Sequence, residues 1–171
     1  MTYRRATGLL VLLAAIAAIL GHQALESSTA APAPTIDVPR PQVEIPGTAG
    51  LDPALLGALG RAARDAADDG VEVVVTSGRR TPEHQAQLFR EAVVKYGSAE
   101  EAARWVATPD TSAHVSGDAV DIGPAARQWL SEHGSRYGLC QIYGNEPWHY
   151  ELRPEAIEHG CPPTYADAAQ R

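Results

Sequence analysis

Three side chains that could hold a metal ion lie in two short stretches of the sequence. Residues 112–121, S-A-H-V-S-G-D-A-V-D, supply His114 and Asp121, and the stretch N-E-P-W-H ends at His149. Two neutral imidazoles and one carboxylate suit Zn²⁺ and leave a fourth coordination position open for water, as in catalytic zinc sites. These residue types therefore predict a metal centre that activates water.

A carboxylate close to these residues would provide a general base. Glu146 lies three positions before His149, and Pro147 restricts the backbone between them. We expect the Glu146 carboxylate to lie near the metal without binding it. There it could take a proton from water and pass it to a leaving amine.

A second polar cluster, residues 77–85 (S-G-R-R-T-P-E-H-Q), directly follows the β-branched run 71–76. We expect that run to be a central strand with a guanidinium at its end. A guanidinium in such a place can bind a developing oxyanion or a substrate carboxylate. The histidines to which we assign no role are His22, His84, His133 and His159.

Capping residues and apolar spacing predict the elements that position these side chains. If the strands that carry Asp121 and His149 pair, both side chains can project onto one face of a sheet. Helices that precede a cluster of strands indicate the α+β class. We expect helices over 53–69, 82–96, 99–106 and 124–133, a loop over 107–117, strands over 71–76, 118–122, 139–143 and 148–152, and a turn of helix from 154.

The N-terminal residues predict export. Arg4 and Arg5 precede the apolar run 8–21, which is shorter than the ~20 residues of a comfortable membrane span. We expect residues 1–23 to be a signal peptide or an uncleaved N-terminal anchor. The protein would then lie in the cell envelope or outside the cell. A Pro/Ala/Ser-rich spacer over 24–50, a folded domain over 51–165 and a C-terminal tail over 166–171 would follow.

Cysteine usage and charge narrow the possibilities further. Cys140 and Cys161 are the only cysteines, and an oxidising compartment would permit a disulfide between them; two free buried thiols are the alternative. The net charge of −7 argues against a nucleic-acid partner, because such a partner needs a basic face.

The motifs together resemble those of the VanY-type zinc D-alanyl-D-alanine carboxypeptidases. The resemblance rests on S-x-H-x-x-G-x-A-x-D (residues 112–121), on E-P-W-H (146–149), and on S-G-R-R-T…Q, which is similar to the family's S-G-aromatic-R-S…Q. It covers residues 71–152. The fold that it implies is a small α+β domain with a central antiparallel sheet and flanking helices, shared with D-Ala-D-Ala dipeptidases and the hedgehog signalling domain.

The resemblance also implies roles for individual residues. Glu146 would be the catalytic base and Arg80 the family's arginine, with Gln85 and Ser112 helping to hold the peptide terminus. One Zn²⁺ per chain would be bound by His114, Asp121 and His149. The sequence departs from the family pattern twice: Arg79 replaces an aromatic residue, and Tyr150-Glu151-Leu152 lacks the Arg-Tyr pair that is common after the last ligand.

The expected function is removal of the terminal D-Ala from peptidoglycan stem peptides by a monomer that meets a membrane only through an uncleaved anchor. An L,D-carboxypeptidase, an L-Ala-D-Glu endopeptidase and a non-catalytic zinc-containing cell-wall-binding module remain open. A D-Ala-D-Ala dipeptidase is disfavoured by export. An iron oxygenase is disfavoured because His114 and Asp121 lie seven positions apart instead of two.

Overall fold

The computed structural model of the protein describes residues 44–171. The expected signal peptide or anchor and most of the expected spacer lie outside these residues. In the described part of the chain, no helix has both the length and the apolar character needed to cross a membrane. Ile45, at the end of the expected spacer, is buried in the same core as the helices and strands that follow.

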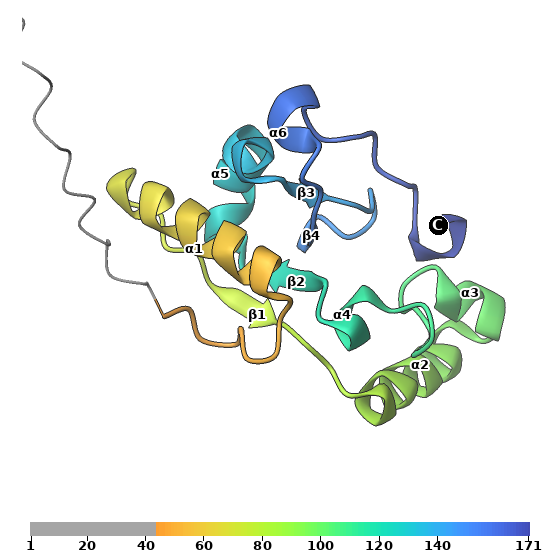
Figure 1. The fold of residues 1–171 in the computed structure, drawn as a ribbon. Helices are drawn as coiled ribbons and strands as arrows, with labels where there is room; N and C mark the ends of the chain where they lie inside the picture. Colours follow the sequence, from red (N-terminus) through yellow and green to blue (C-terminus); the bar gives the residue numbers. More distant parts are fainter. Residues whose placement is uncertain (1–43) are drawn as a thin grey trace, which may run out of the picture. The chain divides into compact units, whose positions relative to one another are not determined.

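Four short antiparallel strands form the sheet, in the order β1-β2-β4-β3 (Figure 1). This arrangement confirms the α+β class and the small antiparallel sheet. The two central strands carry two of the predicted metal ligands, and Asp121 on β2 lies directly opposite His149 on β4. The strands are β1 (Val75–Ser77), β2 (Ala119–Ile122), β3 (Leu139–Gln141) and β4 (His149–Leu152).

The first strand differs from the prediction in position and in length. It lies at the edge of the sheet and begins at Val75 instead of at residue 71. Val75 pairs with Ile122, the last residue of β2, so the residues before Val75 have no strand to pair with beyond it. The β-branched run correctly indicated extended backbone. Because the partner strand β2 ends at Ile122, only the last residues of the run form strand hydrogen bonds.

The helices lie in two groups around the sheet. Asp52 caps α1 (Pro53–Asp68) by accepting hydrogen bonds from the first backbone N–H groups of the helix, and the buried face of α1 joins the main core. Figure 1 shows α2 and α3 together, away from α1 and α5. The remaining elements are α2 (Pro82–Tyr96), α3 (Ala99–Ala103), α5 (Pro124–His133), α6 (Ala156–His159) and the 3-10 turns η1 (Gly134–Tyr137) and η2 (Ala168–Gln170).

A short helix occupies part of the expected 107–117 loop. This helix, α4 (Ala113–Ser116), carries His114, and it ends at Gly117, whose φ of +88° belongs to the left-handed region that favours glycine. A side chain at Gly117 would also approach the carbonyl oxygen of Gly50 to 2.8 Å. The glycine of the H-x-x-G motif therefore lets the chain turn from His114 into β2. The preceding helix, α3, also ends earlier than expected, at Ala103.

The expected disulfide is present. Cys140 on β3 is bonded to Cys161, which follows α6, with a Cα–Cα distance of 5.5 Å. The bond joins two positions that are 21 residues apart, and β4 lies between them. The disulfide therefore restrains the segment that brings His149 to the sheet.

Opening this disulfide should destabilise the domain without removing any metal ligand. Cys161→Ala leaves the buried Cys140 in place, and we expect it to lower the free energy of unfolding by about 3 kcal/mol, because a loop of this length is no longer closed in the unfolded chain. Urea unfolding measures the change. Reductant should lower the stability of the parent to that of the variant and leave the variant unchanged; equal stability of parent and variant would contradict the expectation.

Candidate metal centre

Three potential ligand atoms converge between α4 and the two central strands. The Nε2 atom of His114 lies 3.3 Å from Nδ1 of His149 and 3.3 Å from Oδ1 of Asp121. The third side of this triangle, from Nδ1 of His149 to Oδ1 of Asp121, is 3.6 Å. All three residues are buried. The structure therefore brings together the three residues that the sequence predicted as metal ligands.

The outer nitrogen of each imidazole determines which tautomer is present. Nδ1 of His114 lies 2.8 Å from the carbonyl oxygen of Gly78, and Nε2 of His149 lies 3.1 Å from a carboxylate oxygen of Glu151. An ionised carboxylate and a carbonyl can only accept, so these ring nitrogens carry the protons and donate. In its neutral form, each ring therefore turns its other, unprotonated nitrogen toward the Asp121 carboxylate.

Such an arrangement fits a bound cation. With both rings neutral and no cation bound, the lone pairs of the two inner nitrogens would face Oδ1 of Asp121, an oxygen that is buried without a hydrogen-bond partner, which is costly. Tetrahedral zinc with bonds of ~2.0–2.1 Å holds its ligand atoms about 3.3 Å apart. The triangle has this size, and its donor set is one that zinc prefers.

The strand-end motif holds His114 by its backbone as well as by its ring. The N–H of Arg80 donates to the carbonyl of His114 at 2.9 Å, while the carbonyl of Gly78 accepts from the ring. Gly78 must be a glycine, because a Cβ atom there would lie 2.2 Å from the carbonyl oxygen of Gly47. The S-G-R-R and H-x-x-G motifs thus form one positioning unit.

Arg80 pairs with the second oxygen of the Asp121 carboxylate. Its Nη2 donates to Oδ2 of Asp121 at 2.7 Å, its Nη1 to Oε1 of Gln85 at 3.2 Å and its Nε to Ser77. Gln85, which is 1% exposed, also donates to the carbonyl of Ala107. Arg80 therefore orients Asp121 so that Oδ1 remains for a metal, and it does so from the end of an edge strand rather than a central one.

A pocket of about 540 Å³ contains the three candidate ligands together with Arg80 and Glu146. Burial raises the pKa of Glu146 to about 7, so near neutral pH this carboxyl group can both accept and release a proton. Ser112 also lines the pocket. Its side chain makes no capping bond to α4, although it stands at the N-cap position.

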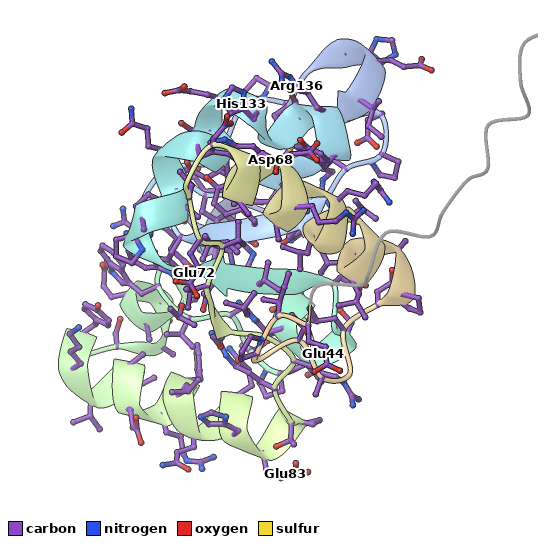
Figure 2. All side chains as sticks on the ribbon, turned by 90° about the vertical axis from the view of Figure 1, so that its left-hand side faces the viewer. Glu44, Asp68, Glu72, Glu83, His133 and Arg136 are labelled. Carbon is purple, nitrogen blue, oxygen red and sulfur yellow. A yellow bond between two sulfur atoms is a disulfide. The ribbon has the colours of Figure 1, made fainter. Side chains whose placement is uncertain are left out.

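Among residues 44–171, the histidines without an assigned role do not line this pocket. Figure 2 shows His133 at the end of the domain opposite Glu83, the first acidic residue of α2, and its ring packs against Trp129. His84 and His159 are exposed, and His22 lies outside the described residues. Arg79 is one of the two departures from the family pattern. Its side chain lies against Gly50, and it is not among the described residues that line the pocket.

Three residues that contact His149 or its partners had no role among the expectations from the sequence. Glu151 accepts a hydrogen bond from the ring, Arg171 donates one to Glu151, and the centroid of the Tyr143 ring lies 5.0 Å from that of the His149 ring. Glu151 could have been found, because residues two apart on a strand share a face. Nothing in the sequence indicated Arg171 or Tyr143, since their contacts depend on how distant segments meet.

A known carboxypeptidase is similar to this chain in sequence. A D-alanyl-D-alanine carboxypeptidase of Enterococcus faecalis (strain ATCC 700802 / V583) is 39% identical over 108 residues, covering 48% of this chain. The match spans only 40% of the length of that relative.

Solved structures with the same fold include a D,D-pentapeptidase and an L,D-carboxypeptidase. VanYB in complex with D-alanine-D-alanine matches with a TM-score of 0.58 and 32% identity, over 64% of this chain and 74% of that one. A variant of the D,D-pentapeptidase VanY in complex with Zn(II) matches with a TM-score of 0.57 and 30% identity, over 65% and 80%. The L,D-carboxypeptidase DacB of Streptococcus pneumoniae matches with a TM-score of 0.52 and 28% identity, over 68% and 72%.

The family comparison covers most of the described domain. Residues 48–155 match the family described as VanY, D-alanyl-D-alanine carboxypeptidase, and this range includes all three candidate ligands, Glu146 and Arg80. The expected family and the expected hedgehog-like fold are therefore confirmed, and the chain belongs to the VanY family of D-alanyl-D-alanine carboxypeptidases.

Proposed function

We propose that this protein is an exported zinc-dependent D,D-carboxypeptidase that removes the terminal D-Ala from peptidoglycan stem peptides. One Zn²⁺ per chain would be held by His114, Asp121 and His149. The observation that carries the proposal is the convergence of one potential ligand atom each from His114, Asp121 and His149 in a pocket that is also lined by the carboxyl group of Glu146 and the guanidinium of Arg80.

The protein's own groups divide the work of hydrolysis. A bound zinc ion supplies Lewis-acid polarisation of a peptide carbonyl and makes water more acidic. Glu146 takes the proton from water and delivers it to the departing amine, a role for which a pKa of about 7 is well suited. The low polarity that raises this pKa also strengthens every charge interaction within the pocket.

Arg80 is proposed to bind the substrate carboxylate or the developing oxyanion. Three protein partners already hold its guanidinium, yet both terminal nitrogens keep a further N–H that can donate. Because both polar groups of the Gln85 side chain are engaged, we propose that Gln85 acts on the substrate through Arg80. Ser112, whose hydroxyl has no capping role, is proposed to contact the peptide directly.

Sequence identity to the relatives supports D,D-specificity as the first candidate and L,D-specificity as the second. The chain is 32% identical to VanYB, whose structure contains D-alanine-D-alanine, and 28% identical to an L,D-carboxypeptidase. These values favour D,D-specificity and leave L,D-specificity as the second candidate. Export is supported by the Arg4-Arg5 pair with its apolar run and by the disulfide, which is typical of oxidising compartments.

Defined muropeptides test the substrate. We expect the full chain with zinc to release one D-Ala from a pentapeptide stem and to leave a tetrapeptide stem unchanged, as read by mass. Chelator should abolish the reaction. Cleavage of the tetrapeptide alone would assign the L,D-activity instead, and internal cleavage would assign an endopeptidase. Unchanged masses with zinc bound would overturn the hydrolytic proposal and favour a module that only binds cell wall.

A further inference from the structure

A buried carboxylate stands directly behind His149. Glu151 follows His149 by two positions on β4 and is 1% exposed. Its Oε1 accepts from Nε2 of His149 at 3.1 Å, and its Oε2 accepts from Nη2 of Arg153 at 2.7 Å. Donor groups therefore face both oxygens of the carboxylate, which acts as an acceptor for the His149 ring.

The side chain of Arg171 reaches this carboxylate from the C-terminal segment. It donates to Oε1 of Glu151, the same oxygen that faces His149, and to the hydroxyl of Tyr143 at 3.2 Å. The ring of Tyr143 packs on the ring of His149, so Arg171 joins two groups that both contact that histidine. Arg171 thus touches the surroundings of the metal centre without touching a candidate ligand.

The segment that carries Arg171 is fastened along its length. Tyr165 exchanges backbone hydrogen bonds with the chain around Tyr143, donating to Ile142 at 2.9 Å and accepting from Gly144 at 2.8 Å. Asp167, which is 2% exposed, pairs with Arg104 at 2.9 Å. Figure 1 shows this end of the chain beside α3. These contacts place a segment expected to be a tail against the candidate site.

We propose that residues 165–171 are a positioning element of the metal centre, in which Arg171 acts through Glu151 to hold the ring and the tautomer of His149. The inference rests on the proposed function in taking His149 as a zinc ligand. Groups that orient a ligating histidine through its outer nitrogen raise metal affinity, and their loss commonly lowers it 10–100-fold. Arg171 is a positioning residue, since it acts through another side chain.

The direction in which zinc affinity changes when Arg171 is removed distinguishes a positioning role from simple charge repulsion. Arg171 is a cation close to a site for a cation, so the removal of its charge alone would tighten zinc binding. If Arg171 positions Glu151, its removal must weaken zinc binding instead. A purely structural contact would lower the stability of the metal-free chain and leave zinc affinity unchanged.

Zinc affinity of the full chain, measured by competition with a chelator, tests the proposal. We expect Arg171→Ala to weaken Zn²⁺ binding roughly tenfold and Arg171→Lys, which keeps a cationic donor, to recover most of that loss. The control is Arg61→Ala on α1, an exposed arginine without an ion pair among residues 44–171; it should bind zinc as the parent does. The imidazole N–H signal of His149 should exchange faster with solvent in Arg171→Ala than in the control.

Each outcome decides between the two claims. Unchanged or tighter zinc binding in Arg171→Ala, or an equal loss in Arg61→Ala, would overturn the positioning role while the muropeptide assay on the parent still tests the proposed function. A parent that binds zinc but releases no D-Ala would overturn the proposed substrate and leave the affinity comparison decisive. A parent that binds no zinc would overturn both.

Discussion

Replacement of Glu146 with alanine is expected to lower the rate of D-Ala release from a pentapeptide stem by about 10²–10⁴-fold, the contribution of a positioned general base. The side chain is buried in the pocket that holds the candidate ligands, and burial raises its pKa to about 7. In the variant, no carboxylate would accept the proton of water or donate it to the leaving amine. Steady-state kinetics with mass detection measures the loss.

Zinc should remain bound in Glu146→Ala, because Glu146 is not one of the three converging residues. Metal content and chelator competition check this point. Glu158→Ala, on the exposed face of α6, is the matched control and should retain the parent rate. If Glu146→Ala kept zinc and hydrolysed the muropeptide at the parent rate, Glu146 would not be the base.

Replacement of His114 with alanine is expected to remove both zinc binding and measurable hydrolysis. The variant would keep two of three ligands and would leave the carbonyl of Gly78 without its donor. A catalytic zinc site needs three protein ligands with an open fourth position. Metal analysis after dialysis against limiting zinc, followed by the muropeptide assay, measures both losses.

The parent treated with chelator should show the same inactivity, and added Zn²⁺ should restore the parent but not the variant. His159→Ala is the control, since the side chain of His159 is 75% exposed and lies on α6. It should bind zinc and hydrolyse the substrate as the parent does. Zinc bound by His114→Ala with the affinity of the parent would exclude His114 as a ligand.

The starts of α1, α2, α3 and α5 follow from local chemistry and were predicted correctly, whereas α4 lies in a segment that was expected to be a loop. Asp52 before Pro53 marks the beginning of α1, and the capping serine Ser98 marks that of α3. These signals lie within a few residues of the element that they start, so they are visible in the sequence. Where α3 ends and where β1 begins depended on neighbouring segments, and there the predictions were wrong.

The pairing of the strands was open until the structure was known. Alternation along each strand showed which neighbours Asp121 and His149 would face away from, and this part of the expectation needed no tertiary contact. The direct opposition of these two residues comes from the β2–β4 register. A shift of that register by one residue would have turned one of the two side chains to the other face.

The residues that orient the candidate ligands could not be identified from the sequence. Arg80 was expected to meet the substrate, but its bond to Asp121 shows that it also orients a candidate ligand. Glu151 appeared only as a departure from the family pattern, and its contacts with His149 and Arg171 give it a partner on either side. Such roles depend on which partner each polar atom of a side chain contacts, and residue types alone do not specify those partners.

By itself the sequence determined the family and the candidates for the metal ligands and the base, because each depends on residue types at short spacings along the chain. Only the tertiary structure decided that three ligand atoms meet within 3.3–3.6 Å and that Arg171 reaches the surroundings of His149. Those distances arise where α4, two central strands and the C-terminal segment pack together. Contacts between segments so far apart in the chain depend on the packing of a common core, so they cannot be predicted from local sequence.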